Sequence, residues 1–149
     1  MPPSAGWPPH HATPAQLMRL KDTQTLFRAA IRNGDRVERA LLNERFHAII
    51  GEMADNEYLM PSLRRLLIDH TRIGMTFYDP HNRMLAAQRE EAADQHDRFI
   101  ALIEAGDADG AAALALAHWE LSRSALESFV MPASLEIPLG ATPAPRAMA

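Results

Sequence analysis

The chain of 149 residues contains no cysteine, so it can form neither disulfide bonds nor thiolate ligands to a metal. It has no apolar run near the roughly 18 to 20 residues that a membrane-spanning helix needs. The 15 basic residues are outnumbered by 19 acidic ones, and a net charge of −4 offers no positive field to a nucleic-acid backbone. The start of the chain lacks the basic and apolar regions of a signal peptide. We therefore expect a soluble cytoplasmic protein that by itself binds neither membranes nor nucleic acid.

Proline is concentrated at the two ends of the chain, with five of the 11 residues in the first 14 positions. Proline lacks the amide donor that regular secondary structure requires. Between the ends, an apolar share of 47% over the chain is sufficient for a globular core. We predict a flexible proline-rich arm at residues 1–12, one domain at residues 13–131 and a proline-rich tail at residues 132–149.

Apolar residues within the domain recur every three or four positions, which is the spacing of the buried face of a helix. Thr13 and Pro14 are typical of an N-cap and a first helical residue, and this first helix should end near Arg32. Four more helices are predicted. Three of them cover about residues 36–54, 83–105 and 109–131. The other begins after a cap at Asp55 or Asn56 and ends at the turn at residues 78–82. No segment keeps the alternation of a strand, so the predicted fold is an all-α antiparallel helical bundle.

The third of these helices is predicted to bury a stripe of six apolar side chains, which are Leu59, Leu63, Leu66, Leu67, Ile73 and Phe77. The fourth and fifth helices should form an antiparallel hairpin about the turn at Asp107. His96 and His118 are equally distant from this turn, and both fall on the apolar faces of their helices. Each one alone is more often a hydrogen-bonded core histidine than a ligand. Their symmetric placement predicts that the two imidazoles meet inside the bundle.

The second helix offers two further polar side chains on one face, because Asn43 and His47 are four residues apart. If this face turns toward His96 and His118, three imidazoles and one amide oxygen converge. Such a set, rich in nitrogen and free of sulfur, suits zinc, nickel or another divalent transition metal with positions left for water or an anion. His70 lies on the apolar stripe of its helix and is a reserve ligand.

Several other side chains are candidates for a role in binding. Arg72 and Arg123 could reach a carboxylate in a cavity of the bundle, although solvated surface arginines are commoner. His10, His11 and His81 fall in loops or arms and are expected to be solvated. No serine or cysteine nucleophile motif, glycine-rich phosphate loop or zinc-protease helix is present.

Two segments, NERFHAIIGEMADNEYL and QHDRFIALIEAGDADGAAALALAHWELSR, resemble the FCD domain, the effector-binding domain at the C-terminus of FadR-type regulators in the GntR family. The likeness covers about residues 13–131. In that family a helical bundle encloses a divalent metal held by an aspartate and three histidines, and small organic acids bind in the same cavity. The resemblance therefore implies that the metal residues are Asn43, His47, His96 and His118, with asparagine at the aspartate position.

The resemblance also implies a winged-helix DNA-binding domain before the bundle, and usually one more helix that opens the bundle. Neither fits within the first 12 residues. A bundle without its opening helix should expose an apolar groove, and a partner should cover it. We therefore expect a homodimer.

The leading hypothesis is a metal-dependent sensor of small carboxylates in a transcriptional regulator, and not an enzyme. Two alternatives stay open. A small metal-dependent hydrolase could use the same histidines to activate water, and a purely structural bundle could keep them as hydrogen-bonded core residues.

Overall fold

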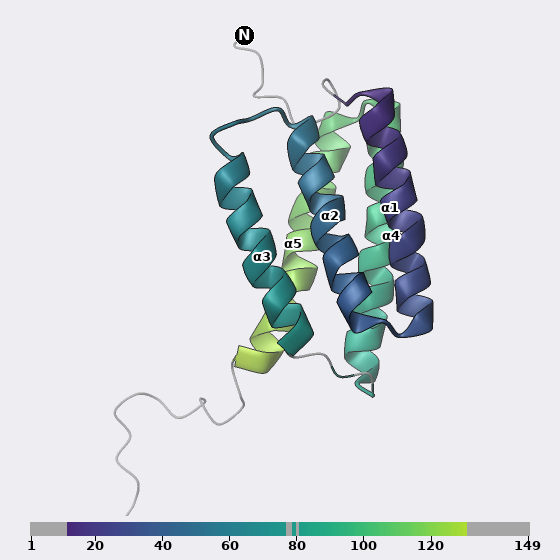
Figure 1. Cartoon of the computed structure of the whole chain (residues 1–149), viewed down its shortest axis with the longest axis vertical. Helices are drawn as coiled ribbons and strands as arrows, with labels where there is room; N and C mark the ends of the chain where they lie inside the picture. The colour runs from purple at the N-terminus through teal and green to yellow at the C-terminus, as the bar shows by residue number, and fades with distance from the viewer. Residues whose placement is uncertain (1–11, 77–78, 80, 131–149) are drawn as a thin grey trace, which may run out of the picture.

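The structure of the protein is a computed structural model that describes residues 12–76, 79 and 81–130. The described residues form no strand. They form five helices, which are α1 (Pro14–Asn33), α2 (Arg36–Met53), α3 (Met60–Thr76), α4 (Arg83–Ala105) and α5 (Ala108–Val130). The helices run up and down as an antiparallel bundle (Figure 1). The predicted all-α fold is confirmed.

Local sequence signals set most of the helix ends. Thr13 caps α1, since its side chain accepts from Gln16 N and the Gln16 side chain accepts from Thr13 N. Asp35 and Asn82 cap α2 and α4 in the same way, by accepting from the backbone three residues later. Gly106 ends α4 with a left-handed φ of 69°, a conformation that favours glycine. The predicted hairpin turn therefore lies where expected, and α5 begins at Ala108 immediately after it.

The prediction for the third helix was wrong at its start and along part of its apolar stripe. Asn56 caps the turn that leads into the helix, since its side chain accepts from Tyr58 N and Leu59 N and its carbonyl oxygen accepts from Met60 N. The helix α3 itself begins only at Met60. Leu59 and Leu66 are 63% and 66% exposed. Among the described helices α3 packs closely only against α2, which leaves Leu66 exposed, while Ile73 lines the cavity described below. Phe77 lies outside the described residues.

The core lies where α1, α2, α4 and α5 meet. Helix α2 packs against α1, α1 packs against α4, and α4 packs against α5. Helix α3 lies at the edge of the bundle beside α2 (Figure 1). The central buried cluster consists of Leu20, Phe46, Ile49, Ile50, Met53, Phe99, Ile100, Ile103 and Leu114. It fills the end of the bundle near the turn after α4, and the polar site described below lies next to it.

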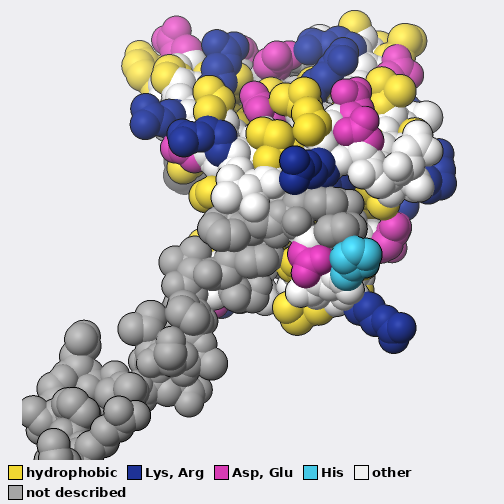
Figure 2. All heavy atoms as spheres, turned by 60° about the horizontal axis from the view of Figure 1, so that its bottom comes forward, with side chains coloured by type: hydrophobic (Ala, Val, Ile, Leu, Met, Phe, Trp, Pro, Cys, Tyr) yellow, Lys and Arg dark blue, Asp and Glu magenta, His cyan; other side chains and the backbone are white. Residues whose placement is uncertain are grey.

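The surface carries charges of both signs. On the face shown in Figure 2, lysine and arginine side chains alternate with aspartate and glutamate around small apolar patches. Within the described part of the chain, no helix is long and apolar enough to cross a bilayer.

Candidate metal centre

Three histidines from three helices meet inside the bundle. His47 comes from α2, His96 from α4 and His118 from α5, and one ring nitrogen of each lies within 4.8 Å of those of the other two. The rings of His96 and His118 have centroids 5.0 Å apart, which confirms the predicted meeting across the hairpin. The ring of His47 is 5.1 Å from that of His96 and 5.0 Å from that of His118.

Aromatic side chains enclose the cluster on the side of the core. His96 is fully buried and stacks on Phe46, with centroids 3.9 Å apart and planes 8° apart. Phe27 contacts His96 at a centroid distance of 4.9 Å, and Phe99 meets His118 edge-on at 5.7 Å. Rings held on several sides cannot turn freely, so their nitrogens keep fixed directions.

His47 and His118 face each other through their Nε2 atoms. His96 and His118 use Nδ1 to contact the amide oxygens of Gln24 and Gln95, at 3.2 Å and 2.7 Å respectively. His118 Nε2 lies 3.2 Å from His47 Nε2. His96 Nε2 is buried and has no hydrogen-bond partner among the described residues.

This arrangement fits a divalent transition metal. Nitrogens bound at about 2.0 to 2.1 Å to one ion lie roughly 3 to 3.5 Å apart, and the two Nε2 atoms of His47 and His118 are 3.2 Å apart. A buried polar atom without a partner costs free energy, and a metal would satisfy His96 Nε2. Imidazole donors are typical of zinc, copper, iron and nickel sites.

Burial keeps the three histidines neutral near pH 7. Loss of solvation is the main cause that lowers the pKa of His47 to about 3, and His118 and His70 lower it further. Burial and then His70 lower the pKa of His118 to about 4. Burial also holds the pKa of His96 well below its usual value. Neutral rings are the form that binds metals.

We predict that acid destabilises the metal-free protein before its carboxylates titrate. In the unfolded chain these histidines take up protons below about pH 6.5. In the folded protein His47 and His118 stay neutral to about pH 4, and burial holds the pKa of His96 well below its usual value. The unfolded state therefore binds more protons in this window, and stability falls as pH decreases. Each such histidine should contribute about 1.4 kcal/mol per pH unit.

Urea unfolding of chelator-treated protein between pH 7.5 and 5 measures this effect. The variant His81→Ala is the control, because His81 is exposed and should leave the slope unchanged. A free energy of unfolding that stays constant from pH 7 to pH 5 would contradict the burial of neutral histidines.

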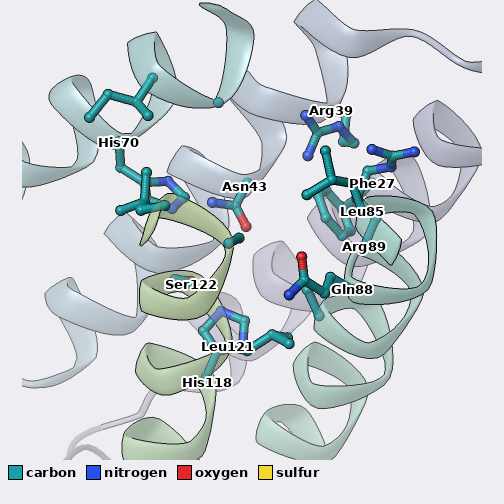
Figure 3. A pocket seen from close by; sticks show the side chains of 15 residues that line it. Phe27, Arg39, Asn43, His70, Leu85, Gln88, Arg89, His118, Leu121 and Ser122 are labelled. Carbon is teal, nitrogen blue, oxygen red and sulfur yellow. The ribbon is translucent and has the colours of Figure 1, made fainter. Parts of the chain in front are cut away.

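A cavity of about 140 Å³ adjoins the histidine cluster. In Figure 3 the side chains of Asn43, Gln88 and His118 project into it from α2, α4 and α5. Its polar lining is Arg39, Asn43, His70, Gln88, Arg89, His118 and Ser122, and the remaining lining residues are apolar or glycine. No described lining residue is a carboxylate, so the cavity has two cationic side chains and no anionic one.

The structure brings some of the predicted site residues together and separates others. Asn43 and His70 line the cavity beside His118. Arg72 and Arg123 do not line it. The Arg72 side chain is 76% exposed and pairs with Asp69, and Arg123 pairs with Glu120 and Glu127 on its own helix. His10 and His11 lie outside the described residues, and His81 is exposed as predicted.

Sequence reasoning missed the two arginines that do line the cavity. Arg39 precedes Asn43 by four residues and Arg89 precedes His96 by seven, spacings that place each arginine on the same helix face as a metal candidate. This helical spacing is the sequence signal that could have identified Arg39 and Arg89 as residues of the cavity.

The fold and the cluster define an all-α bundle with an interior site suited to a metal and an adjoining cationic cavity. Residues 5–121 match the family model of the FCD domain, and the chain belongs to this family. FCD domains are the regulatory effector-binding domains of GntR-family transcription factors. Comparisons with curated proteins and with solved structures gave no match.

Proposed function

We propose that this chain is a metal-dependent sensor domain for small organic acids in a FadR-type regulator of the GntR family. The observation that carries the proposal is the convergence of three imidazoles beside a cavity whose charged lining residues are both arginines. The proposed role is ligand binding, which biases the conformation of a regulator, and not catalysis.

The proposed metal is zinc or nickel, held by His47, His96 and His118 with Asn43 as a weaker fourth ligand. These donors are three neutral imidazoles and one amide, so none of them compensates the charge of the ion. Hard ions such as Mg²⁺ prefer several oxygen ligands, and this site would not select them. The bound metal would supply a positive centre that coordinates an anion.

Charge at the other side of the cavity favours the same ligand class. Arg39 lies close enough that its charge, after the larger effect of burial, helps to lower the pKa of His70. Arginine pairs with carboxylates through a planar fork of donors. We infer that Arg39 and Arg89 take one carboxylate of a di- or tricarboxylate while another faces the metal.

The hydrolase alternative has less support. A metal-activated water usually works with a general base. The described lining of the cavity contains no carboxylate for this role, which leaves His70 as the lining histidine outside the cluster that could take it. The homodimer and the cytoplasmic location expected from the sequence belong to the same proposal. Any DNA binding would come from another domain.

We predict that citrate stabilises the zinc-loaded protein strongly and the chelator-treated protein weakly. A ligand at about 100 times its dissociation constant adds roughly 2.7 kcal/mol to the free energy of unfolding. Succinate should act in the same direction and acetate much less, because acetate cannot reach the arginines and the metal together. Thermal unfolding with each acid, with zinc or with EDTA, measures the effect.

The variant Arg39→Met should lose most of the citrate effect and keep zinc binding. Arg72→Met is the matched control, because Arg72 lies on the exposed side of α3 and should leave the citrate effect unchanged. Equal citrate stabilisation with zinc and with EDTA would contradict metal dependence. Loss of stabilisation in Arg72→Met alone would move the acid site to α3.

A further inference from the structure

Two buried glutamines contact the histidine cluster from outside the cavity. Gln24 of α1 is 3% exposed and Gln95 of α4 is 5% exposed. As described above, their amide oxygens lie at hydrogen-bond distance from Nδ1 of His96 and of His118. Each glutamine therefore contacts Nδ1 of its imidazole and leaves Nε2 of the same ring available.

Other hydrogen bonds fix the direction in which each amide points. Gln24 Nε2 donates to the carbonyl oxygen of Ala93 at 2.8 Å and to Asp97 Oδ1 at 3.0 Å. Gln95 Nε2 donates to Glu91 Oε1 at 3.0 Å. Turning either amide over would place its oxygen against these acceptors. The oxygen must therefore face the histidine.

An amide oxygen accepts hydrogen bonds and cannot donate them, so Nδ1 of each histidine must carry the proton. A neutral imidazole has only one such proton, and its Nε2 then keeps a free lone pair. We propose that Gln24 and Gln95 are positioning residues that hold His96 and His118 as Nδ1–H tautomers and so present Nε2 to the metal. This inference rests on the proposed function.

The hydrogen bonds that hold Gln24 continue from the candidate metal centre to the surface. Asp97, which accepts from Gln24, also accepts from Arg28 Nε at 2.8 Å. Arg28 pairs in addition with Asp94, which does not contact Gln24 among the described hydrogen bonds. A chain from Arg28 through Asp97 and Gln24 thus reaches His96 and joins α1 to α4 at the site.

The substitutions Gln24→Met and Gln95→Met test the inference, because methionine has similar length and no strong acceptor. Each should weaken zinc binding by about 10- to 100-fold, the range seen when a residue that orients a metal ligand is lost. Competition with a chromophoric chelator measures the affinity. Gln16→Met is the matched control on α1, since Gln16 accepts only a capping hydrogen bond at the helix start, and its affinity should equal that of the unsubstituted protein.

Long-range ¹H–¹⁵N spectra of zinc-free protein give a second readout that folding effects do not imitate. The unsubstituted protein should show Nδ1–H for both His96 and His118, and each methionine variant should show mixed tautomers at the histidine it contacts. Asp97→Ala should weaken zinc binding more than Asp94→Ala. The double substitution Glu91→Gln, Gln95→Glu keeps an acceptor for His118 and should restore the tautomer and the affinity.

An Nε2–H tautomer at either histidine of the unsubstituted protein would overturn the inference without the use of any variant. Unchanged zinc affinity in both methionine variants would overturn it as well. If the Nδ1–H tautomers are present and zinc does not bind, the proposed function fails and the tautomer assignment stands. If zinc binds and the tautomers differ, only the role of the glutamines fails.

Discussion

Replacement of His96 by alanine is expected to abolish tight zinc binding and, with it, the stabilisation by citrate. His96 Nε2 is a buried nitrogen without a partner among the described residues, and the ring of His96 stacks on Phe46 and contacts Phe27. Its removal deletes one of three imidazoles, so the loss should exceed the roughly 10- to 100-fold typical of residues that only orient a ligand. Chelator competition measures the affinity, and thermal unfolding measures the citrate effect.

His96→Ala also leaves a cavity in the core, which by itself should cost about 3 kcal/mol. His118→Ala is therefore the companion variant, because His118 lies at the border of the cavity and is 9% exposed. It should lose zinc binding at a smaller cost in stability. His81→Ala, at an exposed histidine, is the control for nonspecific effects. Zinc affinity near that of the unsubstituted protein in either cluster variant would contradict the three-histidine site.

Substitution of Asn43 by aspartate is expected to tighten zinc binding by about tenfold or more, because a carboxylate adds an opposite charge next to the ion in a partly buried site. Asn43 lines the cavity four residues before His47 on α2. The same added charge should repel the effector, so citrate stabilisation should decrease. An increase in zinc affinity together with a decrease in citrate stabilisation is the result expected for this position. Chelator competition measures the zinc affinity, and thermal unfolding of the same preparation measures the citrate stabilisation.

The isosteric variant Asn43→Leu separates the charge from the shape of the side chain. It should weaken zinc binding moderately, because it removes only an amide oxygen. If Asn43→Asp leaves zinc affinity unchanged, Asn43 does not contact the metal, and the resemblance has assigned the fourth ligand wrongly.

The bundle and the centre of the site could be predicted because local rules decide them. Helix ends are set by residues that act on their near neighbours in the chain, as the caps Thr13 and Asn82 and the left-handed Gly106 do. Such signals can be recognised in the sequence. The meeting of His96 and His118 follows from their equal distance to the hairpin turn. The place of His47 in the cluster depends on one further assumption. The helix face that carries Asn43 and His47, four residues apart, must turn toward the inside of the bundle.

Features that depend on packing between distant helices could not be predicted in the same way. The apolar stripe of α3 suggested full burial, but α3 contacts only α2 and leaves Leu66 exposed. Arg72 and Arg123 are the arginines proposed from the sequence, whereas Arg39 and Arg89 line the cavity, because the sequence does not fix the orientation of each helix about its own axis. The contact of Gln24 with the cluster could not be predicted, because its partner His96 is 72 residues away in the sequence.

Metal analysis of the purified protein after zinc loading and gel filtration tests the central claim most directly. We predict one zinc per chain in the unsubstituted protein and in His81→Ala, and close to none in His118→Ala measured side by side with them. Absence of zinc from the unsubstituted protein, or retention of one zinc per chain by His118→Ala, would contradict a metal centre formed by His47, His96 and His118.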